Sequence, residues 1–208
     1  MYNEETTTQL AIYLLNLAGG SMNWQDLMRL LYMTEREIVL SRGEARTWDT
    51  IISEKCGPIL KQTYEIITGK QKSTKWCNNI SQIDNDKIQI LKTYNEKELS
   101  QLSQYDKNKM IAIFNKYDWN LTWNQTNIIK TFPEWEKTKG NNEIIELIEI
   151  LNTKNCSKEL LNYFTEHLEN DRDISEKQLI KKLKQGKKEQ TYVKHSTSHD
   201  LPKRARIS

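Results

Sequence analysis

The segment from residue 27 to residue 69 carries the strongest pattern in the chain, because its apolar side chains recur at helical spacing. Leu27 and Leu31 fall on one face of a helix, and Gly43 supplies the left-handed conformation at which helices often end. The next segment, RTWDTIIS at residues 46–53, is rich in Trp, Thr and Ile and favours an extended strand.

A turn follows at Gly57 and Pro58. Proline is common at the first position of a helix, where its missing N–H would have had no partner in any case. The dipeptide therefore predicts a second helix that starts at Pro58 and stops at Gly69. The whole segment predicts a helix, a strand, a turn and a helix.

The rest of the chain is mostly helical in pattern. A second short strand is predicted at residues 87–91, and we expect it to pair with residues 48–52. The predicted fold class is mainly α: a compact helical domain with a small two- or three-stranded antiparallel element, then C-terminal helices and a flexible basic tail. Helices are predicted over residues 4–18, from Glu96 to Tyr117, over 123–130, over 144–151 and in two segments after Ser157. The segment from Glu96 to Tyr117 could be one helix or could be broken near Tyr105 and Asp106. The predicted divisions are residues 1–138, 139–185 and 186–208.

The composition is that of a globular chain with large aromatic side chains to bury. Of 208 residues, 37% are hydrophobic, and six Trp and nine Tyr add buriable area. The three cysteines, Cys56, Cys77 and Cys156, are odd in number and form no CxxC, which argues against disulfides and zinc. No apolar run approaches the roughly 20 residues that span a bilayer. We expect a cytoplasmic protein without a cofactor.

Positive charge is concentrated at the C-terminal end. The net charge is only +3, but residues 171–208 hold 11 Lys and Arg against 5 Asp and Glu. Such a segment could contact phosphates through charge alone, or it could be a solvated or partner-docking tail. The candidate phosphate-binding residues are Lys181, Lys182, Lys184, Lys187, Lys188, Lys203, Arg204 and Arg206.

Two motifs in the opening segment resemble the Panacea, or SocA-like, antitoxin domain. They are LLYMTEREIVLSRGEA and EKCGPILKQTYEIITG, and a later stretch ending in Pro133, Glu134 and Trp135 is similar to the closing helices of that family. The resemblance covers about residues 7–138. Its motif positions are Leu31, Tyr32, Glu35, Arg36, Gly43, Gly57, Pro58, Tyr64 and Trp135.

The chain departs from the family pattern at two places. Thr34 and Glu35 stand near the position of a family Asp, and Lys130 and Thr131 stand where a Thr-His pair is expected. The resemblance implies a mostly helical domain with a small antiparallel strand element. It also implies a role in toxin–antitoxin systems, often on phages or mobile elements, in which a toxin is neutralised by direct binding or delivered to a protease.

Catalysis is not predicted. Glu54, Cys56 and His167 are reactive residue types, but no glycine-rich elbow or spacing makes them a nucleophile and base. The candidate partner-binding residues are Trp48, Trp76, Trp119 and Trp123, with Trp76 also expected to anchor the polar loop around it.

Each motif residue also has a purely structural interpretation. Tyr32 and Tyr64 could be core residues whose hydroxyls reach a polar partner. Glu35 and Arg36 could form a buried polar network or a solvated face. Gly57 and Pro58 could be an ordinary turn.

Three functions therefore remain open at this level. The first is an antitoxin that binds a cognate protein toxin, with or without a protease or chaperone partner. The second is a nucleic-acid-binding regulator that uses the basic tail. The third is an inhibitor of a host factor, carried by a phage or mobile element. No membrane partner is expected.

Overall fold

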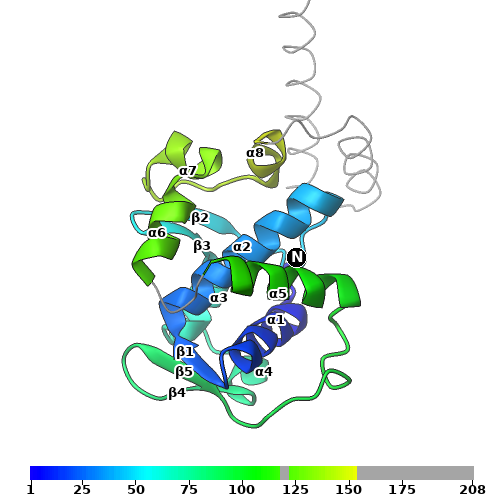
Figure 1. The fold of residues 1–208 in the computed structure, drawn as a ribbon. Coiled ribbons are helices and arrows are strands. Elements are labelled where there is room, and N and C mark those ends of the chain that lie inside the picture. Colours follow the sequence, from blue (N-terminus) through cyan, green and yellow to red (C-terminus); the bar gives the residue numbers. More distant parts are fainter. Residues whose placement is uncertain (118–121, 154–208) are drawn as a thin grey trace, which may run out of the picture. The chain divides into compact units, whose positions relative to one another are not determined.

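The computed structural model describes residues 1–117 and 122–153 (Figure 1). About half of these residues are helical, and the described strands form two small antiparallel sheets. The predicted antiparallel element is thus confirmed, although helices dominate less than "mainly α" implies. The two predicted helices after Ser157 and the basic tail lie outside the described residues.

Helix α2 (Trp24–Arg42) is the central element, and it contacts helices before and after it in the chain (Figure 1). Asn23 caps it by accepting a hydrogen bond from the Gln25 amide at 2.8 Å, and Gly43 ends it with φ 69°. Both ends therefore follow from local sequence. The helices that contact it include α1 (Glu4–Leu17), α5 (Gln104–Lys116), α6 (Thr122–Lys130) and α8 (Leu147–Asn152).

The first sheet has the strand order β1-β5-β4, and its strands are β1 (Ser21–Asn23), β5 (Lys87–Ile90) and β4 (Ile80–Gln82). The predicted pairing of residues 87–91 with residues 48–52 is wrong. Met22 lies opposite Ile88 instead, and both are buried. β1 is only three residues long, and one apolar residue, Met22, between two polar ones is too short a pattern to predict a strand.

The second sheet is a hairpin of β2 (Ile51–Glu54) and β3 (Gly57–Leu60). Pro58 therefore lies in a strand, and helix α3 (Lys61–Ile67) starts only after it, which corrects the predicted helix start. The Lys61 amide donates to Thr50 O, so Thr50 and Lys61 form a hydrogen-bonded pair. Hydrogen-bonded and non-hydrogen-bonded pairs alternate along an antiparallel ladder, so Ser53 and Pro58, three positions further along, form a non-hydrogen-bonded pair. A proline there loses no ladder hydrogen bond.

Two more helix boundaries differ from the prediction. α5 starts at Gln104 rather than Glu96, because Ser103 and Asp106 form a capping box. Residues 144–146 are not helical: Ile144 forms an isolated antiparallel bridge with Ile52, and α8 begins at Leu147. The remaining described helices are α4 (Thr74–Cys77) and α7 (Pro133–Thr138).

Residues 139–153 belong to the same compact unit as the described residues before them. The Ser53 amide donates to Glu143 O, and the Ile145 amide donates to Ile51 O, so this segment extends the hairpin. The three-part division of the chain stays a prediction, because the residues that would form most of its second and third parts are not described.

Candidate functional site

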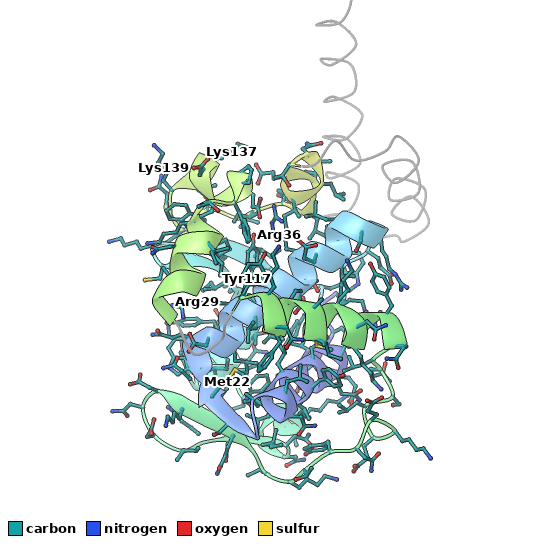
Figure 2. The ribbon with its side chains drawn as sticks, in the orientation of Figure 1. Met22, Arg29, Arg36, Tyr117, Lys137 and Lys139 are labelled. Carbon is teal, nitrogen blue, oxygen red and sulfur yellow. The ribbon has the colours of Figure 1, made fainter. Side chains whose placement is uncertain are left out.

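Motif residues of α2 are tied to the start of α7 by a buried carboxylate. The Tyr32 hydroxyl donates to Glu134 Oε1 at 2.6 Å, and Arg36 Nε donates to the same oxygen at 2.5 Å. The Arg36 guanidinium carbon also lies 4.1 Å from the ring centroid of Phe132. Figure 2 shows Arg36 directed from α2 toward the segment that carries α7 and α8. Residues far apart in the sequence are thereby fixed to one another.

Burial sets the protonation of this cluster. Glu134 is 2% exposed and Arg36 is 8% exposed. Desolvation, and then the charge of Glu134, raises the pKa of Tyr32 well above its ordinary value, so its hydroxyl stays protonated. Desolvation disfavours the charge of Arg36, but the hydrogen bond and charge of Glu134 outweigh it and raise the pKa of Arg36. The cluster is a buried ion pair with a neutral tyrosine, which suits a structural clamp.

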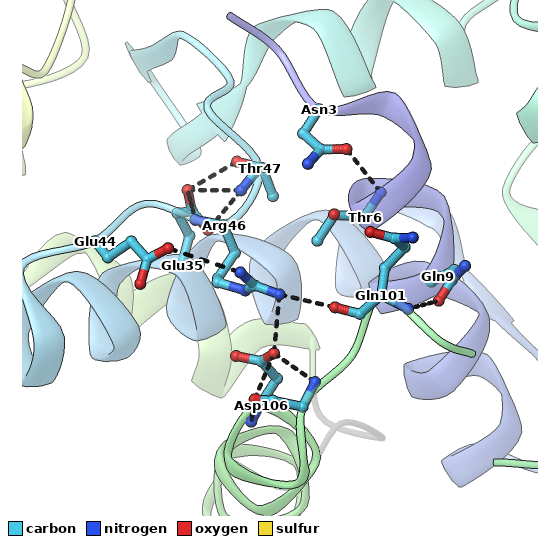
Figure 3. A network of polar contacts seen from close by, with 10 residues as sticks. Asn3, Thr6, Gln9, Glu35, Glu44, Arg46, Thr47, Gln101 and Asp106 are labelled. Atoms are coloured by element: carbon cyan, nitrogen blue, oxygen red, sulfur yellow. Dashed lines mark hydrogen bonds and ion pairs between the residues drawn. The ribbon is translucent and has the colours of Figure 1, made fainter. Parts of the chain in front are cut away.

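Glu35 points to a different part of the fold (Figure 3). Its carboxylate is 1% exposed and accepts hydrogen bonds from the Arg46 amide, the Thr47 amide and the Thr47 hydroxyl, at 2.9 to 3.2 Å. Desolvation raises the pKa of Glu35 to about 7, against the opposing effect of these donors. Glu35 and Arg36 are therefore both buried, and the solvated-face interpretation does not hold.

The network continues from Glu35 through the residue that it binds. The Arg46 side chain donates to Gln101 O at 2.8 Å and forms an ion pair with Asp106 Oδ2 at 3.1 Å (Figure 3). The Gln101 amide donates to Gln9 Oε1 of α1 at 2.9 Å. The Glu35 network thus fastens the loop after α2 to both α1 and α5.

Three further motif residues lie around a surface groove of about 230 Å³. Gly57, Pro58 and Tyr64 line it, and the Tyr64 ring lies 5.9 Å from the ring of Trp24. Gly57 has φ +119°, and a Cβ on it would lie 2.8 Å from Ile129 Cγ2. The groove is also lined by residues for which the sequence predicted no role, namely Trp24, Gln25, Met28, Arg29, Lys55 and Ile59. Trp24 and Met28 are one helical turn apart, and this spacing could have predicted an apolar face at the start of α2.

The predicted tryptophans are distributed unevenly. Trp48 is half-buried at φ 50°, in the loop that Glu35 fastens. Trp76 is 5% exposed on α4, so it anchors its loop as expected but presents no surface to a partner. The side chains of Trp119 and Trp123 and all the candidate phosphate-binding residues lie outside the described part.

The other motif positions have structural roles. Trp135 is half-buried, and its Nε1 donates to Glu54 O at 2.9 Å, which joins α7 to the hairpin. Leu31 is fully buried in the core, and Gly43 ends α2.

Within the described ranges, no group of three or more His, Cys, Asp or Glu side chains lies close enough together to hold a metal ion. Cys56 and Cys77 are free and exposed. Among the described helices, none is both long and apolar enough to cross a membrane.

The family model described as antitoxin SocA-like, Panacea domain, matches residues 27–136, which is more than half of the chain. The matched range includes the Tyr32–Arg36–Glu134 cluster, Glu35 and all the residues that line the groove except Trp24 and Gln25. No curated protein and no solved structure gave a match. The chain therefore belongs to the SocA-like, Panacea-domain antitoxin family.

Proposed function

We propose that this protein is an antitoxin that neutralises a cognate protein toxin by binding it directly. The observation that carries the proposal is the family match over residues 27–136. Direct binding needs a complementary surface rather than a reactive group, and a few anchor residues commonly supply most of the affinity of such a surface. The motif side chains Tyr32, Glu35 and Arg36 are engaged in buried contacts, which supports a scaffold role.

A pre-organised surface favours tight binding, because little conformational freedom is then lost when the partner arrives. The described fold provides such pre-organisation. The cluster around Glu134 fixes α7 to α2, and the Glu35 network fixes the loop after α2 to α1 and α5. The groove lies on the same scaffold, between α2, the β2–β3 turn and α3.

Co-expression with the product of the adjacent small open reading frame tests the proposal. That product should arrest growth when it is expressed alone, and this chain should restore growth and co-purify with it at near-equal stoichiometry. A truncated chain that ends within α2 is the control. Failure of the full chain both to restore growth and to bind would contradict the antitoxin function.

The abundance of the toxin separates direct neutralisation from delivery to a protease. Neutralisation by binding leaves the amount of toxin unchanged in growing cells, whereas an adaptor lowers it. Quantitative immunoblotting of the toxin with and without this chain measures the difference. A toxin level that falls several-fold only when the chain is present would replace direct neutralisation by the adaptor mechanism.

A further inference from the structure

Three isoleucines form a row on the outer face of the hairpin. Ile52 lies opposite Ile59 in the β2–β3 ladder, and opposite Ile144 in the isolated bridge. Residues that are directly opposite in antiparallel strands place their side chains on the same face. Ile52 and Ile59 are half-buried, while Ile144 is 57% exposed. The row is therefore an apolar stripe that the described chain leaves partly uncovered.

The isoleucine row continues into the groove. Ile59 belongs to both, because it also lines the groove beside Pro58 and Tyr64. Trp24 and Met28 of α2 also line the groove. We use the name hairpin face for the surface formed by Ile144, Ile52 and Ile59 together with Tyr64 and Trp24 of the groove.

The exposed charges beside the groove are positive. Lys55 lies at the turn of the hairpin and lines the groove, and Lys61 follows β3 directly. The Lys70 ammonium lies 5.1 Å from the ring centroid of Tyr64. All three lysines are exposed, whereas Glu54, which also lines the groove, and the nearby Glu65 are half-buried.

Arginine adds no net charge to the groove. Arg29, which also lines it, is neutralised by an ion pair with Asp26 at 2.9 Å. An apolar centre within a positive rim is complementary to an apolar segment that carries carboxylates. It is not complementary to a second copy of itself, because the two positive rims would then oppose one another.

We propose that the hairpin face is the docking surface for the toxin, and that the toxin presents an apolar segment flanked by Asp or Glu. This inference rests on the proposed antitoxin function and adds to it a location and a partner chemistry. The apolar row supplies the buried centre of the interface. The lysine rim sets the orientation of the toxin and speeds the encounter.

Isothermal titration of the full chain with a catalytically inactive form of the adjacent gene's product tests the apolar centre. Ile144→Asp should raise Kd about tenfold or more, because it places a carboxylate within the apolar row and opposite an acidic partner. Leu91→Asp is the matched control: Leu91 is 52% exposed but lies beside the other sheet. Its Kd should stay within about twofold of the wild-type value. Equal effects of the two variants would overturn the proposal.

Charge reversal tests the rim. Lys55→Glu should weaken binding about fivefold or more at low salt, and the difference from wild type should shrink as salt rises. Lys97→Glu, at another exposed lysine away from the groove, should bind like wild type. Unchanged binding of Lys55→Glu at every salt concentration would overturn the acidic-partner chemistry.

The two described cysteines report the location of the interface directly. Cys56 is exposed and lines the groove, while Cys77 is exposed on α4. In full-length chains with one of these cysteines retained and Cys156 replaced by Ser, bound toxin should slow maleimide labelling of Cys56 about tenfold or more. Labelling of Cys77 should change little. Protection of Cys77 alone would place the interface elsewhere.

The outcomes distinguish this inference from the antitoxin function. If the wild-type chain restores growth and binds the toxin, but Ile144→Asp and Lys55→Glu bind equally well, the docking surface is wrong and the function stands. If wild type does not bind, both fail. Tighter binding by Ile144→Asp would mean that another part of this chain covers the surface, and self-association abolished by that variant would mean that a second copy does. Either result overturns the proposal.

Discussion

Two neighbouring residues, Glu35 and Arg36, connect α2 to two different parts of the fold. Glu35 accepts hydrogen bonds from the loop after α2, and Arg36 donates to Glu134 at the start of α7. Successive residues of a helix point about 100° apart, so one dipeptide can reach two different neighbours. The raised pKa of Glu35 makes its contribution to stability measurable as a dependence on pH.

Stability should fall as pH rises through the pKa of Glu35. Burial raises the pKa of Glu35 from 4.5 to about 7 in the folded chain. Between these values the folded state keeps a proton that the unfolded state has lost, so the unfolding free energy decreases with pH by up to about 3 kcal/mol from this group. Urea denaturation from pH 4.5 to pH 8 measures the effect.

Glu35→Gln supplies the comparison. The variant cannot titrate at this position, so its unfolding free energy should depend less on pH than that of wild type over the same window. Two parallel pH profiles would show that Glu35 does not hold the raised pKa. Burial also raises the pKa of Asp49, so a part of the wild-type slope remains in the variant.

Gly57 is required for two separable reasons, backbone conformation and space. Gly57→Ala must adopt φ +119° and would place its Cβ 2.8 Å from Ile129 Cγ2, whereas Gly69→Ala, at φ +74°, meets nothing within 4 Å. We expect about 1 kcal/mol of destabilisation for Gly69→Ala and roughly 1 to 3 kcal/mol more for Gly57→Ala. Urea unfolding of both variants measures the difference, and equal losses would show that Ile129 can move aside.

At the scale of elements, α2 is the helix on which the other helices and the hairpin converge. Its termini are set locally by Asn23 and Gly43. Its apolar face, in contrast, is buried only because other elements of the fold pack against it. The ion pair between Arg36 and Glu134 fixes the position of α7, and the Trp135 hydrogen bond to Glu54 joins α7 to the hairpin. The hairpin face is therefore held from two sides.

Removing the Glu134 carboxylate should destabilise the fold more than removing the Tyr32 hydroxyl. Glu134→Leu leaves the buried Arg36 with only the longer ion pair to Glu37, at 3.7 Å, and should cost up to about 3 to 5 kcal/mol. Tyr32→Phe loses one hydrogen bond to a charged group, about 1.5 to 3 kcal/mol. Denaturant unfolding of each variant gives both values.

A double variant tests whether the ion pair itself stabilises the protein. Arg36→Met combined with Glu134→Leu removes both charges and should unfold less readily than Glu134→Leu alone, because no uncompensated charge is left buried. If the losses from the single variants simply add in the double variant, the two side chains do not interact energetically.

At the scale of the whole molecule, the proposed docking surface lies within the described residues, so the basic C-terminal segment should be dispensable for toxin binding. Deleting residues 186–208 should leave Kd for the toxin within about threefold of the full-chain value and should still permit growth. Titration calorimetry and growth after co-expression measure this. A loss of binding that grows at low salt would instead assign the toxin contact to the deleted lysines and arginines.

The sequence predicted the helices best where their ends carry local signals. Gly43 ends α2 as predicted, whereas the capping box of Ser103 and Asp106 starts α5 inside a segment that was predicted to be helical from Glu96. The prediction failed at Pro58, because a proline is equally compatible with a helix start and with a non-hydrogen-bonded strand position. Only the register with Ser53 distinguishes the two.

The sequence by itself determined the family, the central helix and the presence of a small antiparallel element, because these depend on periodicity, capping and turn residues close together in the chain. Tertiary structure alone decided which strands pair, that Glu134 meets Tyr32 and Arg36, and that Ile144 joins Ile52 and Ile59. These contacts join residues tens of positions apart. Local preferences contain no information about which distant partner will satisfy a buried charge or complete a sheet.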